Sequence, residues 1–253
     1  MDIAGKSAFI TGGASGLGAA TANVLAALGA RPAVFDRDAA KGEAVAAELG
    51  GQFFAVDVSD AASAEAAVKA AVEAMGAPSV LVNCAGIGTA SRIVGRDGPM
   101  PLDAFSRVIN VNLVGSFNMM RLCAHAMSLA EPDANGQRGV IISTASVAAF
   151  DGQIGQAAYA ASKGGIVSLT LPAAREFARF GIRVLAIAPG LFLTPLLAEL
   201  PQDVQDGLAA SIPNPARLGK PDEFAALVRS MVENDYLNGE VVRLDGALRM
   251  AAK

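Results

Sequence analysis

Residues 7–18 read SAFITGGASGLG, and this stretch decides the fold. Residues 7–11 are a short apolar run typical of a buried strand, and a helical pattern follows over residues 17–28. The turn between them contains Gly12, Gly16 and Gly18, spaced as in a dinucleotide-binding turn. Glycine lets the backbone approach a pyrophosphate, which then lies at the helix N-terminus. A glycine-rich turn alone is a weak signal, but the strand before it and the helix after it favour a dinucleotide-binding turn over a turn without a ligand.

Short apolar runs alternate with helical patterns along the rest of the chain. The predicted strands are residues 7–11, 31–36, 52–56, 79–83, 140–144, 183–187 and 240–244. The predicted helices are residues 17–28, 39–49, 61–75, 102–129 and 159–180, the last of which Pro172 should bend or adjust locally. This alternation predicts an α/β fold, a Rossmann-type doubly wound parallel seven-stranded sheet with helices on both faces. We expect one domain, residues 1–253, to carry both dinucleotide binding and catalysis.

Two segments depart from the alternation. Residues 88–101 are rich in glycine, proline and charge, and residues 191–215 combine Leu and Phe with four prolines. Both follow the C-terminal ends of predicted strands, where an open α/β sheet binds its ligand. We therefore expect them to form the walls of the substrate site.

Tyr159 and Lys163 are spaced to share one face of a helix, and Ser146 lies thirteen residues upstream of Tyr159. Tyrosine has a pKa of about 10, so lowering it to about 7 takes roughly 4 kcal/mol of stabilisation of the phenolate. A neighbouring ammonium supplies such stabilisation, and the Ser146 hydroxyl can hold a substrate oxygen against the phenol. The alternative is an ordinary surface Tyr/Lys pair. The glycine turn and the Ser146 spacing favour a general acid/base set.

Asp36 ends the second predicted strand, about 20 residues after the glycines. A carboxylate there binds both adenosine ribose hydroxyls and repels the 2′-phosphate of NADP, so the predicted cofactor is NAD. Arg37 follows Asp36 directly, and an arginine at this place can bind the 2′-phosphate of NADP. The favoured interpretation is that Arg37 is a solvated residue at the end of the strand.

Composition excludes several classes of function. The formal net charge of -4, with no basic run, argues against a nucleic-acid partner. No uninterrupted apolar run reaches the length of a membrane span. Cys84 and Cys123 form no metal-binding pattern and His125 is the only histidine, so we expect no metal site and no Ser-His-Asp hydrolase. The N-terminal residues pass directly into a strand, without a recognisable targeting segment, so a cytoplasmic location is expected.

Several motifs together resemble the short-chain dehydrogenase/reductase family. They are the 11–18 turn, Asn83-Cys84-Ala85-Gly86, Ser146, Tyr159-x-x-x-Lys163 and Pro189-Gly190. Residues 144–150 (TASVAAF), 155–159 (GQAAY), 188–192 (APGLF) and 237–247 (LNGEVVRLDGA) resemble the type II 3-hydroxyacyl-CoA dehydrogenases, also called 17β-hydroxysteroid dehydrogenase type 10. The resemblance implies NAD-dependent oxidation of 3-hydroxyacyl-CoA in fatty acid metabolism, activity on hydroxysteroids and other secondary alcohols, and a homotetramer. Animal members are mitochondrial and have RNA-processing partners, two features that we do not transfer to this chain.

The resemblance also assigns individual residues. It makes Ser146, Tyr159 and Lys163 catalytic, with Asn112 in a proton relay, and it places the substrate against Ser146, Gln156 and Tyr159. The implied cofactor contacts are Gly12, Ser15, Gly16, Leu17, Gly18, Asp36, Asp57, Val58, Asn83, Cys84, Ala85, Gly86, Tyr159, Lys163, Pro189, Gly190, Phe192 and Thr194.

Two other functions remain open at this stage. One is a hydroxysteroid or small-alcohol dehydrogenase with the same catalytic residues, which only the shapes of residues 88–101 and 191–215 would distinguish. The other is a non-catalytic NAD-binding scaffold or redox sensor, which the complete Ser146, Tyr159 and Lys163 set argues against. Asp36 disfavours an NADPH-dependent ketoacyl reductase.

Overall fold

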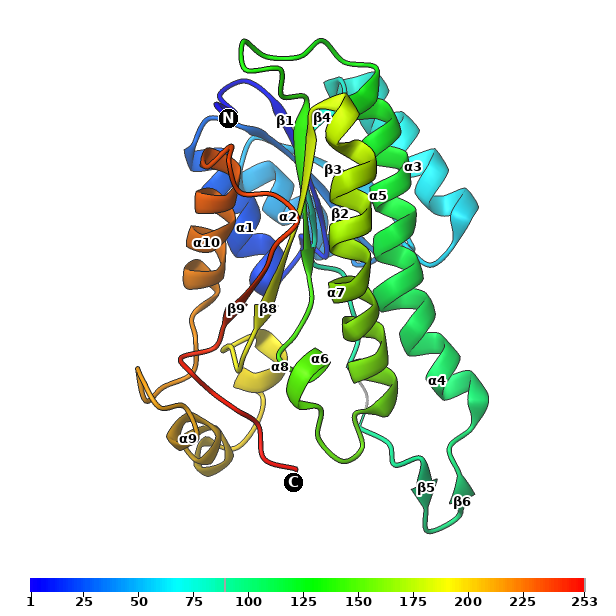
Figure 1. The fold of residues 1–253 in the computed structure, drawn as a ribbon, viewed down its shortest axis with the longest axis vertical. Helices are drawn as coiled ribbons and strands as arrows, with labels where there is room; N and C mark the ends of the chain where they lie inside the picture. The colour runs from blue at the N-terminus through cyan, green and yellow to red at the C-terminus, as the bar shows by residue number, and fades with distance from the viewer. Residues whose placement is uncertain (89, 253) are drawn as a thin grey trace.

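A parallel sheet of seven strands runs through the middle of the protein (Figure 1). In this computed structural model, which describes residues 1–88 and 90–252 except the side chain of Leu196, the strand order is β3-β2-β1-β4-β7-β8-β9. The strands are β1 (Ser7–Thr11), β2 (Arg31–Asp36), β3 (Gln52–Ala55), β4 (Pro78–Asn83), β7 (Gly139–Thr144), β8 (Ile182–Pro189) and β9 (Val241–Leu244). Every adjacent pair is parallel, which confirms the predicted sheet.

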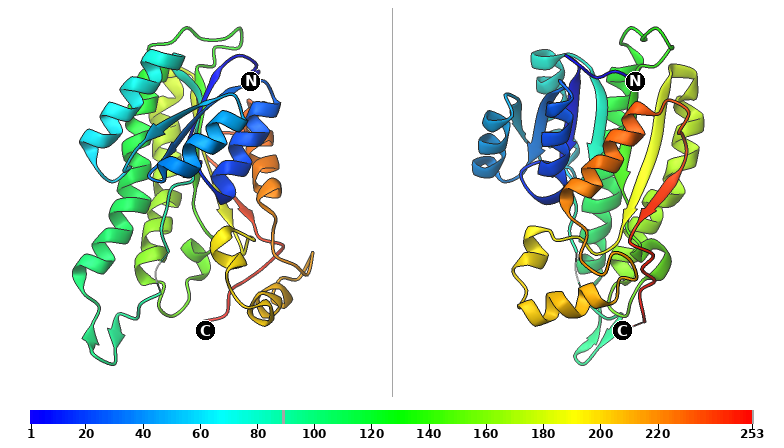
Figure 2. Two further views of the ribbon diagram at one scale, coloured as in Figure 1. Left: turned by 180° about the vertical axis from the view of Figure 1, so that it is seen from behind. Right: turned by 90° about the vertical axis from the view of Figure 1, so that its left-hand side faces the viewer.

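Helices cover both faces of the sheet because successive strand residues point to opposite sides. Ala8 and Ile10 of β1 pack toward α1 (Gly16–Ala27) and α10 (Pro221–Glu233). Phe9, between them, packs toward the other face. That face is covered by α3 (Ala61–Met75), α5 (Gly115–Ser128) and α7 (Ala157–Phe177). Figure 2 shows the two layers from behind and edge-on, and the doubly wound arrangement is confirmed.

The predicted helix over residues 102–129 is wrong in its middle. The structure has α4 (Leu102–Ile109), then a π-helical turn, η1 (Asn110–Val114), and then α5. The extra residue of a π turn rotates the helix that follows, and such turns occur often at functional sites. By contrast, α7 continues through Pro172 and ends in a 3₁₀ turn, η2 (Ala178–Phe180).

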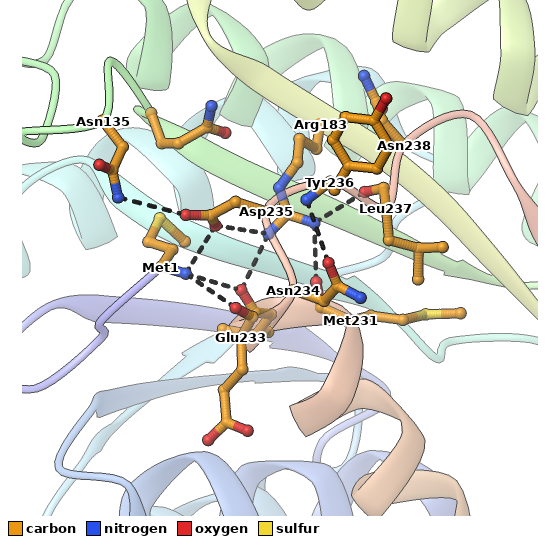
Figure 3. Close-up of polar contacts among 12 residues, drawn as sticks. Met1, Asn135, Arg183, Met231, Glu233, Asn234, Asp235, Tyr236, Leu237 and Asn238 are labelled. Atoms are coloured by element: carbon orange, nitrogen blue, oxygen red, sulfur yellow. Dashed lines mark hydrogen bonds and ion pairs between the residues drawn. The ribbon is translucent and has the colours of Figure 1, made fainter.

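Polar groups close the end of the sheet where β8 begins (Figure 3). The Arg183 guanidinium is 3% exposed and donates to the carbonyls of Met231 (2.7 Å), Val232 (2.9 Å) and Leu237 (3.0 Å). These carbonyls lie at or just beyond the end of α10, where helix geometry leaves carbonyls without intrahelical partners. Asp235 accepts from the Met1 ammonium at 2.7 Å. This cluster lies at the opposite end of the strands from their C-terminal ends.

The C-terminal ends of the strands carry the longest connections. A hairpin of β5 (Val94–Gly95) and β6 (Gly98–Pro99) projects beyond them (Figure 1), and Thr89 in the same segment lies outside the described residues. Short helices lie nearby: α6 (Ala148–Asp151), α8 (Pro195–Ala198) and α9 (Gln202–Ala210). The remaining helix, α2 (Ala39–Glu48), connects β2 and β3.

The strand order reverses between β1 and β4, and an open α/β sheet binds its ligand at such a point. None of the helices in the described residues combines the length and hydropathy needed to cross a bilayer.

Candidate active site

The glycine turn brings β1 and α1 into close contact. Gly12 has a φ of +64°, and a Cβ on it would meet the Ala85 backbone nitrogen at 2.8 Å. A Cβ on Gly18 would collide with the Gly12 carbonyl. Only glycine fits these two positions. The helix therefore starts directly beside the strand end, with its N-terminal N–H groups available to an anion.

Asp36 is oriented by this turn. One carboxylate oxygen accepts from Ala14 N at 3.1 Å, and the other accepts from Arg37 N at 2.7 Å and Asp38 N at 3.1 Å. At the next strand end, Asp57 accepts from the Ser59 hydroxyl at 2.6 Å, a bond that lowers its pKa. Arg37 is 71% exposed and reaches the Asp57 carboxylate only at 3.8 Å, so this ion pair is weak.

The three predicted catalytic residues meet where β7 and α7 come together. Ser146, 7% exposed, follows β7, and its hydroxyl accepts from Ala148 N at 3.1 Å. Tyr159 and Lys163 occupy the first two turns of α7, with the Lys163 Nζ 5.7 Å from the centre of the Tyr159 ring. Lys163 is 5% exposed, and its ammonium donates to the Thr144 carbonyl at 2.6 Å.

Burial shifts the pKa of both Tyr159 and Lys163. Burial raises the pKa of Tyr159, and only the hydrogen-bonding Ser146 hydroxyl opposes that increase. The Lys163 ammonium lies near the ring and is directed at the Thr144 carbonyl. Burial lowers the pKa of Lys163 itself to about 8, which leaves it mostly charged at neutral pH.

Asn112 lies on η1 and is fully buried. Its side-chain oxygen accepts from Ile87 N at 2.8 Å, and its amide donates to the Ile87 carbonyl at 2.9 Å and to the Ser162 hydroxyl at 3.0 Å. Asn112 thereby joins the segment after β4 to α7. A Cβ on Gly86 would lie 3.2 Å from the Asn112 oxygen and 3.6 Å from Lys163 Nζ, so Asn112 and Lys163 are close neighbours.

A cavity of about 630 Å³ connects the glycine turn with the catalytic residues. Its lining includes these predicted residues: Gly12, Ser15, Gly16, Leu17, Gly18, Asp36, Asp57, Val58, Cys84, Ala85, Gly86, Ser146, Gln156, Tyr159, Lys163, Pro189, Gly190, Phe192 and Thr194. The volume is within the usual range of ligand sites, which is about 300–1,000 Å³.

Two predicted residues do not line this cavity. Asn112 lies just behind it. Asn83 lies within the sheet, where its amide donates to the Ser143 hydroxyl at 3.2 Å and the Ser116 carbonyl at 3.4 Å. The Asn83 side chain thus links β4 to the neighbouring strand β7, because its amide is bonded within the sheet and does not point into the cavity. The contact of Asn83 with the cofactor stays a prediction.

Other lining residues lack a local signal in the sequence. They are Phe35, Val56, Ile87, Val111 and Met250. Val147 and Ala148, from the motif 144–150, and Pro195, from the predicted wall 191–215, line the cavity as well. Thr144, which the motif 144–150 contains, also lines the cavity, and its hydroxyl donates to the Cys84 sulfur at 3.6 Å. Burial raises the pKa of Cys84 to about 11, so this thiol is neutral.

The two predicted substrate walls differ in their relation to the site. Leu191 and Leu197 line the main cavity, and Phe192 packs edge-on against Phe224 at 6.4 Å between ring centres. A second cavity of about 380 Å³ lies between residues 92–94 and 152–157, and Gln156 lines both cavities. The side chain of Leu196, which belongs to the predicted wall of residues 191–215, lies outside the described part of the chain.

Comparisons with known proteins identify the class. The family model for short chain dehydrogenases matches residues 6–205, and the chain belongs to this family of oxidoreductases. A 3-hydroxyacyl-CoA dehydrogenase type-2 from Bos taurus is 54% identical over 98% of this chain and 97% of its own, and one from Drosophila melanogaster is 53% identical over 95% and 96%. The crystal structure of 3-hydroxyacyl-CoA dehydrogenase type-2 from Mycobacterium avium superposes with a TM-score of 0.93 at 45% identity, with 98% of both chains covered. The resemblance seen in the sequence is confirmed, and a nicotinamide cofactor follows from the family.

Proposed function

We propose that this dehydrogenase interconverts 3-hydroxyacyl-CoA and 3-ketoacyl-CoA with NAD as its cofactor. The observation that carries the proposal is the convergence of Ser146, Tyr159 and Lys163 on one cavity that also contains the glycine turn and Asp36. The names of the relatives that are more than half identical support the substrate class.

The cavity fits a nicotinamide dinucleotide. Its shape supports this because Gly12 and Gly18 admit no side chain, so the backbone stays open to a pyrophosphate at the start of α1. Asp36 and Asp57 would hold the adenosine end, and Lys163 the ribose beside the nicotinamide. When bound, NAD supplies the carbon that accepts the hydride.

The protein residues then handle the proton. Tyr159, as the phenolate, takes the proton from the substrate hydroxyl while Ser146 holds the substrate oxygen in place. Charged Lys163 lies on the same helix face and favours the phenolate electrostatically. Asn112, bonded to Ile87 and Ser162, connects this site to a path for the released proton.

Asp36 supports NAD over NADP. Its carboxylate is held by three backbone N–H groups at the end of β2, where it would bind ribose hydroxyls and repel a 2′-phosphate. Steady-state turnover with each cofactor tests this. Asp36→Ala should weaken the use of NAD and narrow the gap to NADP, whereas equal efficiency of the unmodified enzyme with both cofactors would contradict it.

The substrate class is tested by comparing acetoacetyl-CoA with free acetoacetate as substrates for reduction by NADH. The CoA ester should be reduced with a much higher kcat/KM. If the exposed Arg92 and Arg96 attract CoA phosphates, added salt should raise the KM for the ester more than the KM for a neutral ketone, because exposed charges are screened. Equal efficiency on ester and acid would refute the acyl-CoA assignment and favour a hydroxysteroid or general secondary-alcohol dehydrogenase.

The assembly and location belong to the same proposal. Exposed apolar side chains on α5 and α7, such as Phe117 (48%) and Leu171 (44%), support burial against further copies, and the proposed state is a homotetramer in the cytoplasm. Sedimentation equilibrium of the purified enzyme tests the tetramer, and a monomer would contradict it.

A further inference from the structure

The segment after β9 begins with a turn at the catalytic end of the sheet. Ala247 N donates to the Asp245 carboxylate at 3.0 Å, and Leu248 N donates to the Asp245 carbonyl at 3.0 Å. Ala247 adopts a φ of +67°, an unusual conformation for a residue other than glycine, and Leu248 is buried. We refer to residues 245–252 as the C-terminal strap.

Arg243 anchors the strap at its start. Its guanidinium donates to Asp151 at 2.6 Å, to Asp245 at 2.7 Å and to the Leu248 carbonyl at 3.0 Å, and it lies 5.2 Å from the centre of the Phe150 ring. These side chains are largely shielded from water: Arg243 is 21%, Asp151 18% and Asp245 8% exposed. One arginine therefore joins β9, α6 and the strap.

The far end of the strap is bound to the loop that precedes α7. Ile154 N donates to the Ala252 carbonyl at 3.0 Å, and the Gln153 amide donates to the Ala251 carbonyl at 3.0 Å. This loop ends at Gln156, the N-cap of α7, so the strap lies next to the segment that presents Tyr159. Between the two anchors, Met250 lines the main cavity together with Gln156 and Tyr159.

We propose that the C-terminal strap is a wall of the substrate site and that Met250 is a specificity-determining residue that limits the length of the substrate's hydrocarbon chain. This inference rests on the proposed function for the identity of that chain. A thioether is apolar and adapts its shape, so it suits contact with a flexible alkyl group. The anchors on both sides of Met250 hold it in place, so the wall resists displacement by a longer chain.

The test is reduction of a series of 3-ketoacyl-CoA esters of increasing chain length by NADH. In Met250→Ala, kcat/KM for longer esters relative to short ones should rise at least about tenfold, the usual effect of one methylene in an apolar pocket. Met250→Leu, which nearly conserves volume, should keep the profile of the unmodified enzyme. Leu129→Ala removes a similar apolar group, 74% exposed just after α5, and should leave the profile unchanged. An unchanged profile in Met250→Ala overturns the proposal.

A second readout does not depend on turnover. Binding of NAD together with acetoacetyl-CoA, a pair that cannot react because both are in the oxidised form, should slow hydrogen exchange of the backbone amides in residues 245–252, and NAD alone should do so less. Unchanged exchange there would refute the strap as a wall. If the enzyme reduces no CoA ester but oxidises secondary alcohols, the proposed function fails, and a series of 2-alkanols then tests Met250 with the same expected shift and the same overturning result.

Discussion

At the scale of single residues, Tyr159 and Lys163 have different surroundings although they share one face of α7. Burial opposes ionisation of both: it raises the pKa of the phenol and lowers the pKa of the ammonium. The phenol has Ser146 as its hydrogen-bond partner, while the ammonium is bound to the Thr144 carbonyl. The site thus keeps a cation beside the tyrosine at some cost in stability, as is common where catalytic groups are buried.

Tyr159→Phe tests the proposed base. The variant keeps the ring and its packing but loses the oxygen that takes the proton. We expect kcat to fall by about 10²–10⁴-fold, the usual effect of losing a general acid/base. Titration of NADH fluorescence should give a nearly unchanged dissociation constant. Near-normal turnover would rule out this role for Tyr159.

Lys163→Met tests the cost of the buried ammonium. The folded pKa of about 8 lies below the ordinary 10.5, so protonated Lys163 destabilises the fold by an amount on the order of 3 kcal/mol. The penalty is complete below pH 8 and declines as pH rises from about 8 toward 10.5, because the folded protein loses the proton first. The free energy of unfolding of the variant minus that of the unmodified enzyme should therefore fall between pH 7 and pH 9.5.

Urea unfolding across that range measures the difference. Loss of the hydrogen bond to Thr144 shifts every point by a similar amount, so the trend with pH is the test. A difference that stays constant or grows with pH would show that burial of the charge is not the cause. The variant should also lose most of its turnover.

At the scale of elements, the connection from β1 to α1 is closely packed. A side chain on Gly12 would collide with the Ala85 backbone, and a side chain on Gly18 would collide with the Gly12 carbonyl. The π turn η1 has a comparable role on the other side, because it places Asn112 between the segment after β4 and α7. The glycine turn and η1 are both short departures from regular backbone geometry, and each lies between two regular elements.

Gly18→Ala should disrupt this connection. Its Cβ would collide with the Gly12 carbonyl, so we expect a loss of about 1–3 kcal/mol in unfolding free energy and weak binding of NADH. Gly207→Ala is the matched control, since Gly207 lies inside α9 with open space around its Cβ position. That substitution should stabilise by about 0.5–1 kcal/mol and leave NADH binding unchanged. Equal effects of the two changes would contradict the packing argument.

At the scale of the whole molecule, the two halves of the cavity share one sheet. β1 and β2 lead into the glycine turn and Asp36, while β7 leads into Ser146, and all belong to the same seven strands. The hydrophobic clusters on both faces extend across the sheet from β1 to β8. Cofactor binding and catalysis therefore depend on one continuous core.

Calorimetry tests whether the chain unfolds as one domain. We expect a single transition, and NAD at 100 times its dissociation constant should stabilise the folded protein by about 2.7 kcal/mol. NADP at the same concentration should shift the transition less. Two separate transitions, only one of which responds to NAD, would contradict the single domain of residues 1–253.

Features that depend on near neighbours in the chain were predictable from the residues alone. The 7–18 stretch contains a strand, its glycine turn and the start of a helix within twelve residues, and its alternation with later elements predicts the doubly wound sheet. Tyr159 and Lys163 are brought together by helix periodicity alone. Asp36 was predictable because the end of a strand next to β1 must lie beside the glycine turn.

The distant segments that complete the site could be identified only from the folded chain. Met250 joins Tyr159 in the cavity through the anchors of Arg243 and the loop before α7, which hold together segments far apart in the chain. Asn83 was expected in the cavity and lies in the sheet, while η1 interrupts a helix that looks continuous in sequence. The physical reason is that these positions depend on packing and hydrogen bonds between elements far apart in the chain. The periodicity of a sequence indicates only which face of its own helix or strand a residue occupies.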